Sequence, residues 1–253
     1  MNNSTITVIT GGSRGLGRST ALALASRGQN SIITYRSGEA AARETIQSIE
    51  KLGARAAMLQ LDVGQVAGFA GFVTRLREVL NSTFGRERFD ALVNNAGEGL
   101  HKPFVETTEA EFDELVNVHL KGPFFLTQRL LPWIEDGGRI VNISSGLARF
   151  SFPGHSAYAS MKGAIEVLTR YQAKELGARG IAVNTVAPGA IATDFNGGAV
   201  RDNSALNAGV ASSTALGRVG LPDDIGGVIS NLLREDNRWI NGQRIEASGG
   251  MNL

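Results

Sequence analysis

Residues 6–28, ITVITGGSRGLGRSTALALASRG, predict a buried strand, a glycine-rich turn and a helix in direct succession. Gly11, Gly15 and Gly17 form the pattern TGxxxGxG in the turn. Glycine at these positions lets the backbone approach a pyrophosphate, which would lie against the free N–H groups and positive dipole of the helix start. A glycine-rich turn without a ligand is the alternative that this motif alone leaves open.

The rest of the chain repeats this alternation of short apolar runs and longer amphipathic segments. We expect strands at 6–10, 31–35, 56–61, 91–95, 139–144, 181–186 and 243–247, and helices at 15–27, 39–52, 65–84, 109–131, 158–177 and 223–234. Strands that are apolar on both faces and separated by helices predict a parallel sheet covered on both sides. The expected fold is α/β: one domain, 1–253, with a Rossmann-type doubly wound parallel sheet of seven strands and helices on both faces.

One segment, 194–222, shows no regular pattern and is rich in Gly, Asn, Ser and Ala. An irregular stretch of this length is uncommon in a compact domain unless it is functional. We therefore expect it to form a lid on the substrate side of a site.

Composition excludes several classes of function. Basic and acidic residues nearly balance, with a formal net charge of +1, so we expect no nucleic-acid or membrane partner. The chain has no cysteine and only three histidines, and we expect no metal site. No long apolar run and no signal-peptide pattern is present, which favours a cytoplasmic protein.

Seven short motifs identify a family resemblance that covers essentially the whole chain. The sequence resembles the short-chain dehydrogenase/reductase family, most closely its 3-oxoacyl-carrier-protein reductase branch. The motifs occur in the family's order: TGGSRGLG (10–17), LDV (61–63), NNAG (94–97), NVHLKG (117–122), NISS (142–145), YASMK (158–162) and APGAIAT (187–193).

The pair Tyr158 and Lys162 is central to the catalysis that this resemblance implies. Four residues apart on a helix, both side chains leave the same face. A nearby cation favours the phenolate, so Lys162 is expected to lower the pKa of Tyr158 toward the working range. The resemblance assigns proton transfer to Tyr158, and it assigns two roles to Lys162, proton supply and contact with the nicotinamide ribose. A surface pair on an ordinary helix is the alternative.

Two further catalytic residues follow from the family's pattern. Ser145 lies at the usual separation before the tyrosine and is expected to hydrogen-bond the reacting oxygen, with Ser144 as its rival or supporting partner. Asn117 matches the helix asparagine that in relatives anchors a water next to the lysine. A buried asparagine without function is the alternative for Asn117.

The expected cofactor is NADP(H). The second strand ends in Tyr35 and Arg36 where NAD-binding relatives carry an acid, and Arg14 lies in the glycine turn. Two guanidinium groups suit a 2′-phosphate, although both arginines could be solvated surface charges. The expected cofactor-binding residues are Gly11, Ser13, Arg14, Gly15, Leu16, Gly17, Tyr35, Arg36, Asp62, Val63, Asn94, Ala96, Gly97, Tyr158, Lys162, Pro188, Gly189, Ile191 and Thr193.

The substrate side is expected to be partly apolar. Its predicted residues are Ser145, Leu147, His155 and Tyr158, with Leu100, His101, Phe150, Phe152 and Phe195 in flanking segments. Plain packing is an equal alternative for the flanking residues.

The function implied is NADP(H)-dependent interconversion of a carbonyl and a secondary alcohol. The substrate would be a small molecule or an acyl-carrier-bound carbonyl compound. A sugar-alcohol or steroid-type dehydrogenase and a non-catalytic NADP-binding sensor are the alternatives. The resemblance also implies a homotetramer, built on the helices at 109–131 and 158–177 and on the last strand.

Overall fold

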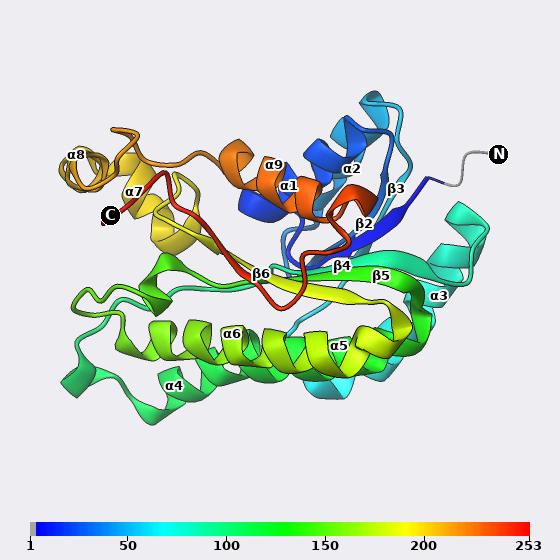
Figure 1. Ribbon diagram of the computed structural model, residues 1–253, viewed down its shortest axis with the longest axis horizontal. Helices are drawn as coiled ribbons and strands as arrows, with labels where there is room; N and C mark the ends of the chain where they lie inside the picture. The colour runs from blue at the N-terminus through cyan, green and yellow to red at the C-terminus, as the bar shows by residue number, and fades with distance from the viewer. Residues whose placement is uncertain (1–3) are drawn as a thin grey trace.

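A computed structural model of the chain describes residues 4–253 and contains one seven-stranded parallel sheet (Figure 1). The strand order is β3-β2-β1-β4-β5-β6-β7. The chain adds strands outward from β1 to β3 on one side and then from β4 to β7 on the other, so the switch point lies between β1 and β4. The strands are β1 (Ile6–Ile9), β2 (Asn30–Tyr35), β3 (Ala56–Gln60), β4 (Phe89–Asn94), β5 (Ile134–Ile143), β6 (Ala182–Pro188) and β7 (Arg244–Ala247). The predicted Rossmann-type sheet is confirmed.

Helices cover both faces of the sheet, as the doubly wound prediction requires (Figure 1). One layer holds α1 (Gly15–Ala25), α2 (Glu39–Lys51) and α9 (Pro222–Leu232). The other layer holds α3 (Phe69–Val79), α4 (Glu109–Val116), α5 (Gly122–Leu130) and α6 (Ser156–Leu176). No helix within residues 4–253 is long and apolar enough to cross a membrane.

The alternation of side chains along each strand divides the core into two clusters. Ile6 and Val8 of β1 pack toward α3, with Phe72 and Leu76 on the facing helix. The next strand residue, Ile9, faces the opposite layer, where α1, α2 and α9 cover it. Successive strand residues point to opposite faces, so a strand buried on both sides must be apolar throughout. This explains why the strands read as continuous apolar runs.

The structure differs from the sequence prediction along 194–222, which was expected to be irregular. This segment contains a 3₁₀ turn (Phe195–Gly198) and two helices, α7 (Ala199–Asp202) and α8 (Ser204–Ser212). Asn203 begins α8 by accepting a hydrogen bond from the backbone N–H of Leu206 at 3.0 Å. The sequence after this cap is rich in alanine. The cap and the high helix propensity of alanine together are sufficient for a short exposed helix.

The predicted helix at 109–131 is divided by a π-helical turn, Asn117–Lys121, between α4 and α5. Single π turns inside α-helices frequently occur at functional sites because they change the direction of the side chains that follow. The turn lies against α6, which carries Tyr158 and Lys162.

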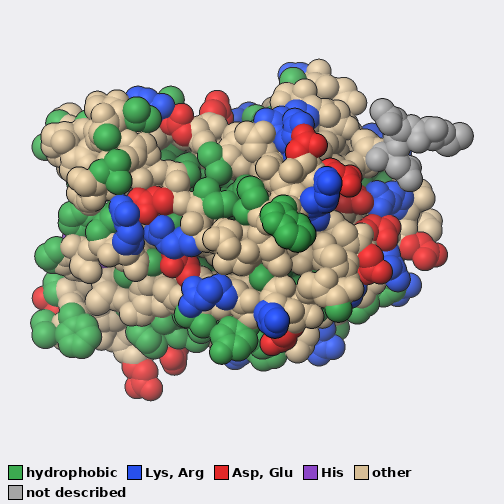
Figure 2. Space-filling view, viewed as in Figure 1, with side chains coloured by type: hydrophobic (Ala, Val, Ile, Leu, Met, Phe, Trp, Pro, Cys, Tyr) green, Lys and Arg blue, Asp and Glu red, His purple; other side chains and the backbone are tan. Residues whose placement is uncertain are grey.

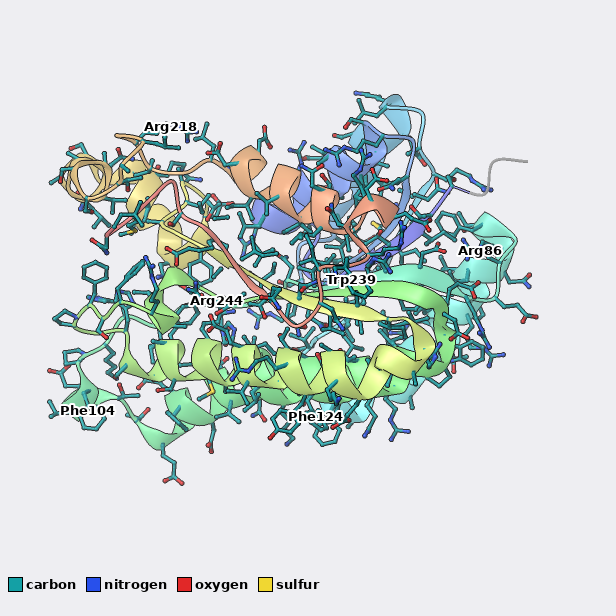
Figure 3. All side chains as sticks on the ribbon, in the orientation of Figure 1. Arg86, Phe104, Phe124, Arg218, Trp239 and Arg244 are labelled. Carbon is teal, nitrogen blue, oxygen red and sulfur yellow. The ribbon has the colours of Figure 1, made fainter. Side chains whose placement is uncertain are left out.

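Large apolar side chains are exposed on the helical layer of α4, α5 and α6 and beside β7. Figure 2 shows apolar surface along the edge formed by these helices and at the end formed by α7 and α8. Phe104 and Phe124 lie at the lower edge of the molecule in Figure 3. Trp239 is 97% exposed and Tyr171 of α6 is 64% exposed. Surfaces of this kind are typical of contacts between protein chains.

Close packing of α9 on α1 generates a stability prediction. A Cβ on Gly226 would lie 2.7 Å from the Ser19 carbonyl carbon of α1, whereas a Cβ on Gly227 would meet nothing within 4 Å. Gly226→Ala should therefore lower the free energy of unfolding by about 1–3 kcal/mol, as overpacking does. Gly227→Ala, the matched control, should leave it unchanged or raise it by up to about 1 kcal/mol. Urea unfolding measures the free energy of unfolding of both variants, and equal changes in the two would contradict the packing described.

Candidate active site

The glycine turn is held in shape by a close contact with the end of β4. A Cβ on Gly17 would lie 2.4 Å from the carbonyl oxygen of Gly11, so only glycine fits there. Asn95 links the two segments, since its side-chain amide donates to the carbonyls of Thr10 (2.8 Å) and Gly11 (3.1 Å). Its neighbour Ala96 donates its N–H to the Thr10 hydroxyl at 2.9 Å. These contacts form one rigid edge at the switch point between β1 and β4, where ligands bind in such sheets.

Asn95 was not singled out from the sequence, although it lies inside the quoted motif NNAG. The neighbouring Asn94, which was predicted to bind the cofactor, directs its amide to Thr127 (3.0 Å) and Asn142 (2.8 Å). The side chain of Asn94 thus ties β4 to α5 and β5, and only its backbone lies at the groove.

A cavity of about 300 Å³ lies at the carboxyl ends of β2 and β3. Arg36, Asp62 and Arg75 are among its lining residues. Arg75 of α3 donates to the Gln60 carbonyl of β3 at 3.1 Å. Sequence reasoning missed this second arginine, because the residue spacing of α3 does not indicate that the Arg75 side chain reaches β3. Arg14 is exposed at the start of α1 and does not line this cavity.

Arg36 also forms an ion pair with Glu98, which follows the NNAG segment, at 3.4 Å. The Arg36 side chain is 60% exposed, and an ion pair in that setting contributes little stability. Its guanidinium can therefore exchange this carboxylate for another anion at small cost.

The remaining predicted cofactor residues lie in the glycine turn, at the start of α1, and at or after the carboxyl ends of β2, β3, β4 and β6. Thr193, beyond β6, lies across from the glycine turn, with its methyl carbon 3.8 Å from where a Cβ on Gly15 would be. Ile191 pairs with Gly220 in a short parallel bridge that fixes this segment. Ser13 lies in the glycine turn and Leu16 in the first turn of α1. The other members end or follow a strand: Tyr35, Val63, Gly97, Pro188 and Gly189.

Tyr158 and Lys162 lie together on the first turns of α6, as predicted. The Lys162 Nζ atom is 5.4 Å from the centroid of the Tyr158 ring and donates to the carbonyl of Ile143 at 2.8 Å. Lys162 is only 5% exposed. The Ser145 side chain lies close enough to Tyr158 to favour the ionised phenol, so the two hydroxyls form a pair at the end of β5.

Burial, rather than attraction between the pair, controls both ionisations. It raises the pKa of Tyr158, and the Ser145 side chain opposes this only in part. It lowers the pKa of Lys162 to about 7. The expected lowering of the Tyr158 pKa is therefore wrong for the protein alone. In the low-dielectric interior, the cost of burying each charge exceeds the gain from the attraction between the two charges.

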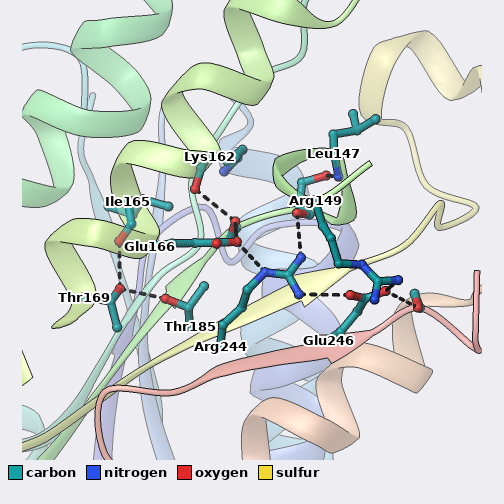
Figure 4. Close-up of polar contacts among 12 residues, drawn as sticks. Leu147, Arg149, Lys162, Ile165, Glu166, Thr169, Thr185, Arg244 and Glu246 are labelled. Atoms are coloured by element: carbon teal, nitrogen blue, oxygen red, sulfur yellow. Dashed lines mark hydrogen bonds and ion pairs between the residues drawn. The ribbon is translucent and has the colours of Figure 1, made fainter. Parts of the chain in front are cut away.

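Ser144 is engaged in a structural network and not in the hydroxyl pair. Its Oγ lies 2.6 Å from a carboxylate oxygen of Glu166 and 3.1 Å from the Lys162 carbonyl (Figure 4). Arg244, from the edge strand β7, donates to the same Glu166 oxygen at 2.7 Å and to the carbonyl of Ser145 at 3.4 Å. The network supports Ser145 as the serine that faces substrate.

The same network reaches the outer side of β7. Arg244 also pairs with Glu246 at 2.9 Å, and Glu246 accepts from Arg149 at 3.0 Å (Figure 4). Glu166 and Arg244 were missed because they lie 78 residues apart in the chain, although Glu166 is one helical turn after Lys162. The network fixes the backbone of Ser145 from two sides.

Asn117 begins the π turn and is half-buried, and within residues 4–253 its side chain has no hydrogen-bond partner. His119, two residues later, is buried and lies edge-on to the Tyr158 ring, with ring centroids 5.3 Å apart. Sequence reasoning did not select His119, although it stands inside the quoted motif NVHLKG. The structure therefore brings the ring of His119 to Tyr158, and the role of Asn117 as a water anchor stays a prediction.

Aromatic and apolar groups surround the other side of Tyr158. Phe195 from the 194–222 segment lies with its ring centroid 5.9 Å from that of Tyr158, and Leu147 and Leu100 pack against the cluster around this tyrosine. The rings of His101 and His155 contact each other at a tilt of 49°, with centroids 4.8 Å apart, across the two loops that flank the site.

The remaining flanking pair, Phe150 and Phe152, forms an edge contact at 5.8 Å. The predicted substrate side is thus assembled largely from rings.

The chemistry open to this arrangement is proton transfer to or from an oxygen. Two hydroxyl groups meet beside a buried amine, and an anion-binding glycine turn lies at the same edge of the sheet.

Comparisons with known proteins agree along nearly the whole chain. A family model described as Enoyl-(Acyl carrier protein) reductase matches residues 11–252. The hydroxynaphthalene reductase-like protein Arp2 of Metarhizium brunneum (strain ARSEF 3297) is 37% identical over 256 residues, which cover 97% of this chain and 94% of that protein.

Two solved structures are similar at the same level. The promiscuous reductase LugOII, described as catalysing keto-reduction at C1 during lugdunomycin biosynthesis, is 40% identical with a TM-score of 0.92, covering 97% of this chain and 96% of that one. The angucycline C-6 ketoreductase LanV with bound NADP is 36% identical with a TM-score of 0.94, covering 99% of this chain and 97% of that one.

Proposed function

The chain belongs to the short-chain dehydrogenase/reductase family, and we propose that it is an NADP(H)-dependent ketoreductase. The observation that carries this proposal is the contact of Ser145 with Tyr158, one helical turn from the buried Lys162. A non-catalytic sensor of NADP would need the glycine turn but would not need this hydroxyl pair next to a buried amine.

Each residue of the set has a separate task in reduction. Ser145 donates a hydrogen bond to the substrate carbonyl oxygen, and Tyr158 gives that oxygen a proton. Lys162, when protonated, stabilises the resulting phenolate. Bound NADPH supplies the hydride to the carbonyl carbon. Glu166 and Arg244 act from behind, holding Ser145 and α6 in place through Ser144 and the Ser145 carbonyl.

The residues present fit a phosphorylated dinucleotide. The glycine turn supplies backbone N–H groups for the pyrophosphate, and the cavity after β2 and β3 places Arg36 and Arg75 on one space of about 300 Å³. The residue that ends β2 is Tyr35, and the absence of a carboxylate at this position supports the choice of a phosphorylated cofactor. The similar ketoreductase LanV was solved with NADP, which supports the same choice here.

The substrate class that we propose is a ketone on a fused aromatic ring system. The ring-rich lining around Tyr158 supports it, and so do the names of the similar proteins, a hydroxynaphthalene reductase-like protein and an angucycline ketoreductase. The expected 3-oxoacyl-carrier-protein substrate has less support. The 194–222 segment acts as the lid, since its Phe195 already touches Tyr158.

We also propose that the protein assembles as a homotetramer. The exposed rings of Phe124 on α5 and Tyr171 on α6 lie on the helices through which relatives are expected to pair, and Trp239 flanks β7 (Figure 3). Light scattering should return about four times the chain mass of 26.7 kDa. A mass near that of one chain at micromolar concentration would refute this assembly.

Tyr158→Phe tests the proposed reaction. It keeps the ring and removes the proton donor, so turnover of a bicyclic aryl ketone should fall by at least about 10²-fold, the lower end for lost general acid catalysis. NADPH binding, followed by cofactor fluorescence, should remain. Wild type should reduce the aryl ketone faster than an acetoacetyl thioester. Retention of most activity in Tyr158→Phe would show that this mechanism is wrong.

The cofactor choice is tested by the double variant Tyr35→Asp with Arg36→Ser. A lost charge-assisted hydrogen bond corresponds to roughly 10- to 150-fold in affinity, and the new carboxylate repels the phosphate as well. The ratio of kcat/KM for NADPH to that for NADH should fall accordingly. Arg14→Ala should lower this ratio less, because Arg14 does not line the cavity.

Arg43→Ala is the matched control, since it removes an exposed arginine on α2 that pairs with Glu39. Its ratio should equal that of wild type. A wild type that prefers NADH, or an unchanged ratio in the double variant, would exclude Arg36 from the 2′-phosphate site.

A further inference from the structure

The buried histidine of the π turn is not used by the mechanism above. His119 is 3% exposed and lies between α6 and the segment that follows β4. A Cβ on Gly97 would stand 2.7 Å from its Cε1 and 3.3 Å from its Nδ1, so the ring fills the space beside this glycine. Gly97 belongs to the segment predicted to line the cofactor ribose.

The two ring nitrogens of His119 differ in their partners. Nε2 lies 2.6 Å from the Glu98 carbonyl oxygen and 3.4 Å from the Glu98 backbone nitrogen. Because two acceptors would repel each other at 2.6 Å, we assign the proton to Nε2, which leaves Nδ1 as the acceptor. Nδ1 is buried, and no group within residues 4–253 hydrogen-bonds it. A buried acceptor of this kind normally has a partner, because leaving it unpaired costs free energy.

The surroundings keep this imidazole neutral. Burial lowers the pKa of His119 to about 3, with a further lowering by the positive charge of Lys162, while the hydrogen bond to Glu98 opposes both. A neutral ring does not repel a protonated Lys162. It also retains the Nδ1 lone pair over the whole physiological pH range.

We propose that His119 is a positioning residue whose Nδ1 accepts a hydrogen bond from an O–H group between Tyr158 and Lys162 in the working enzyme. This rests on the proposed ketoreductase function. The O–H group is either a water or a ribose hydroxyl of the cofactor, which share the chemistry of a hydroxyl donor. The edge-on contact with the Tyr158 ring and the proximity of Gly97 place the imidazole between the proton donor and the predicted cofactor segment.

The consequence concerns the return of protons to the site. Tyr158 transfers one proton to the substrate oxygen, Lys162 passes one to the phenolate, and solvent restores one to Lys162. His119 gains and loses no proton in these steps. It orients the O–H group, so that its hydrogen points away from Lys162 and its oxygen lone pairs remain free to accept.

Two substitutions separate this role from simple packing. His119→Phe keeps a ring against Tyr158 and removes the acceptor, whereas His119→Asn keeps an acceptor and removes the ring. We expect kcat for an aryl ketone to fall by about 10-fold in His119→Phe, the loss of one buried hydrogen bond, and by less than about 3-fold in His119→Asn. Circular dichroism and Tm establish that both variants fold, and His119→Gln serves as a second variant that retains an acceptor.

The opposite order of kcat losses, with His119→Phe active and His119→Asn and His119→Gln impaired, would show that the ring only packs. Equal losses of kcat in all three variants would also overturn the proposal. The Kd for NADPH distinguishes the two donors: a weakened Kd in His119→Phe indicates the ribose hydroxyl. An unchanged Kd with a larger solvent isotope effect on kcat indicates water. An active Tyr158→Phe enzyme would refute the ketoreductase mechanism itself, whereas full activity in His119→Phe alone would refute only this inference.

Discussion

The buried amine of Lys162 is the constraint that much of the surrounding structure satisfies. Removing an ammonium from water is costly, and its one backbone partner is the carbonyl of Ile143 at the end of β5. That contact fixes α6 against β5, and it thereby fixes Tyr158 relative to Ser145. Because the pKa of Lys162 is lowered to about 7, the amine can be either charged or neutral near neutrality. A residue in that state can exchange protons, which a solvated lysine does poorly at this pH.

Polar groups on the far side of the serine loop complete this arrangement. Glu166 accepts hydrogen bonds from Ser144 and Arg244, and Arg244 also donates to the Ser145 carbonyl. The arginine comes from β7, the last strand of the sheet and its exposed edge. A strand that carries no reacting group is therefore coupled to the geometry of catalysis, because its guanidinium compensates a carboxylate that would otherwise be buried alone.

Local pattern predicted the elements of this fold, and tertiary contact decided the details of the site. The strands and helices followed from apolar periodicity, and Tyr158 with Lys162 from helical spacing, since both signals lie within a few residues. Arg75, Glu166 and Asn95 were missed because their partners come from other elements, and one sequence does not show which surfaces meet. The 194–222 helices were missed because short alanine- and serine-rich helices leave almost no apolar pattern.

Asn117 and His119, two residues of one motif, show what a motif match leaves undecided. Each residue of a helix turns by about 100°, so two residues that are two positions apart point to nearly opposite sides. His119 is the one whose ring meets Tyr158 edge-on. The π turn that begins at Asn117 changes the rotation per residue and so changes the direction of the side chains that follow. A motif match places a residue to within about one turn of a helix. Which side of that turn faces inward decides which residues line the active site.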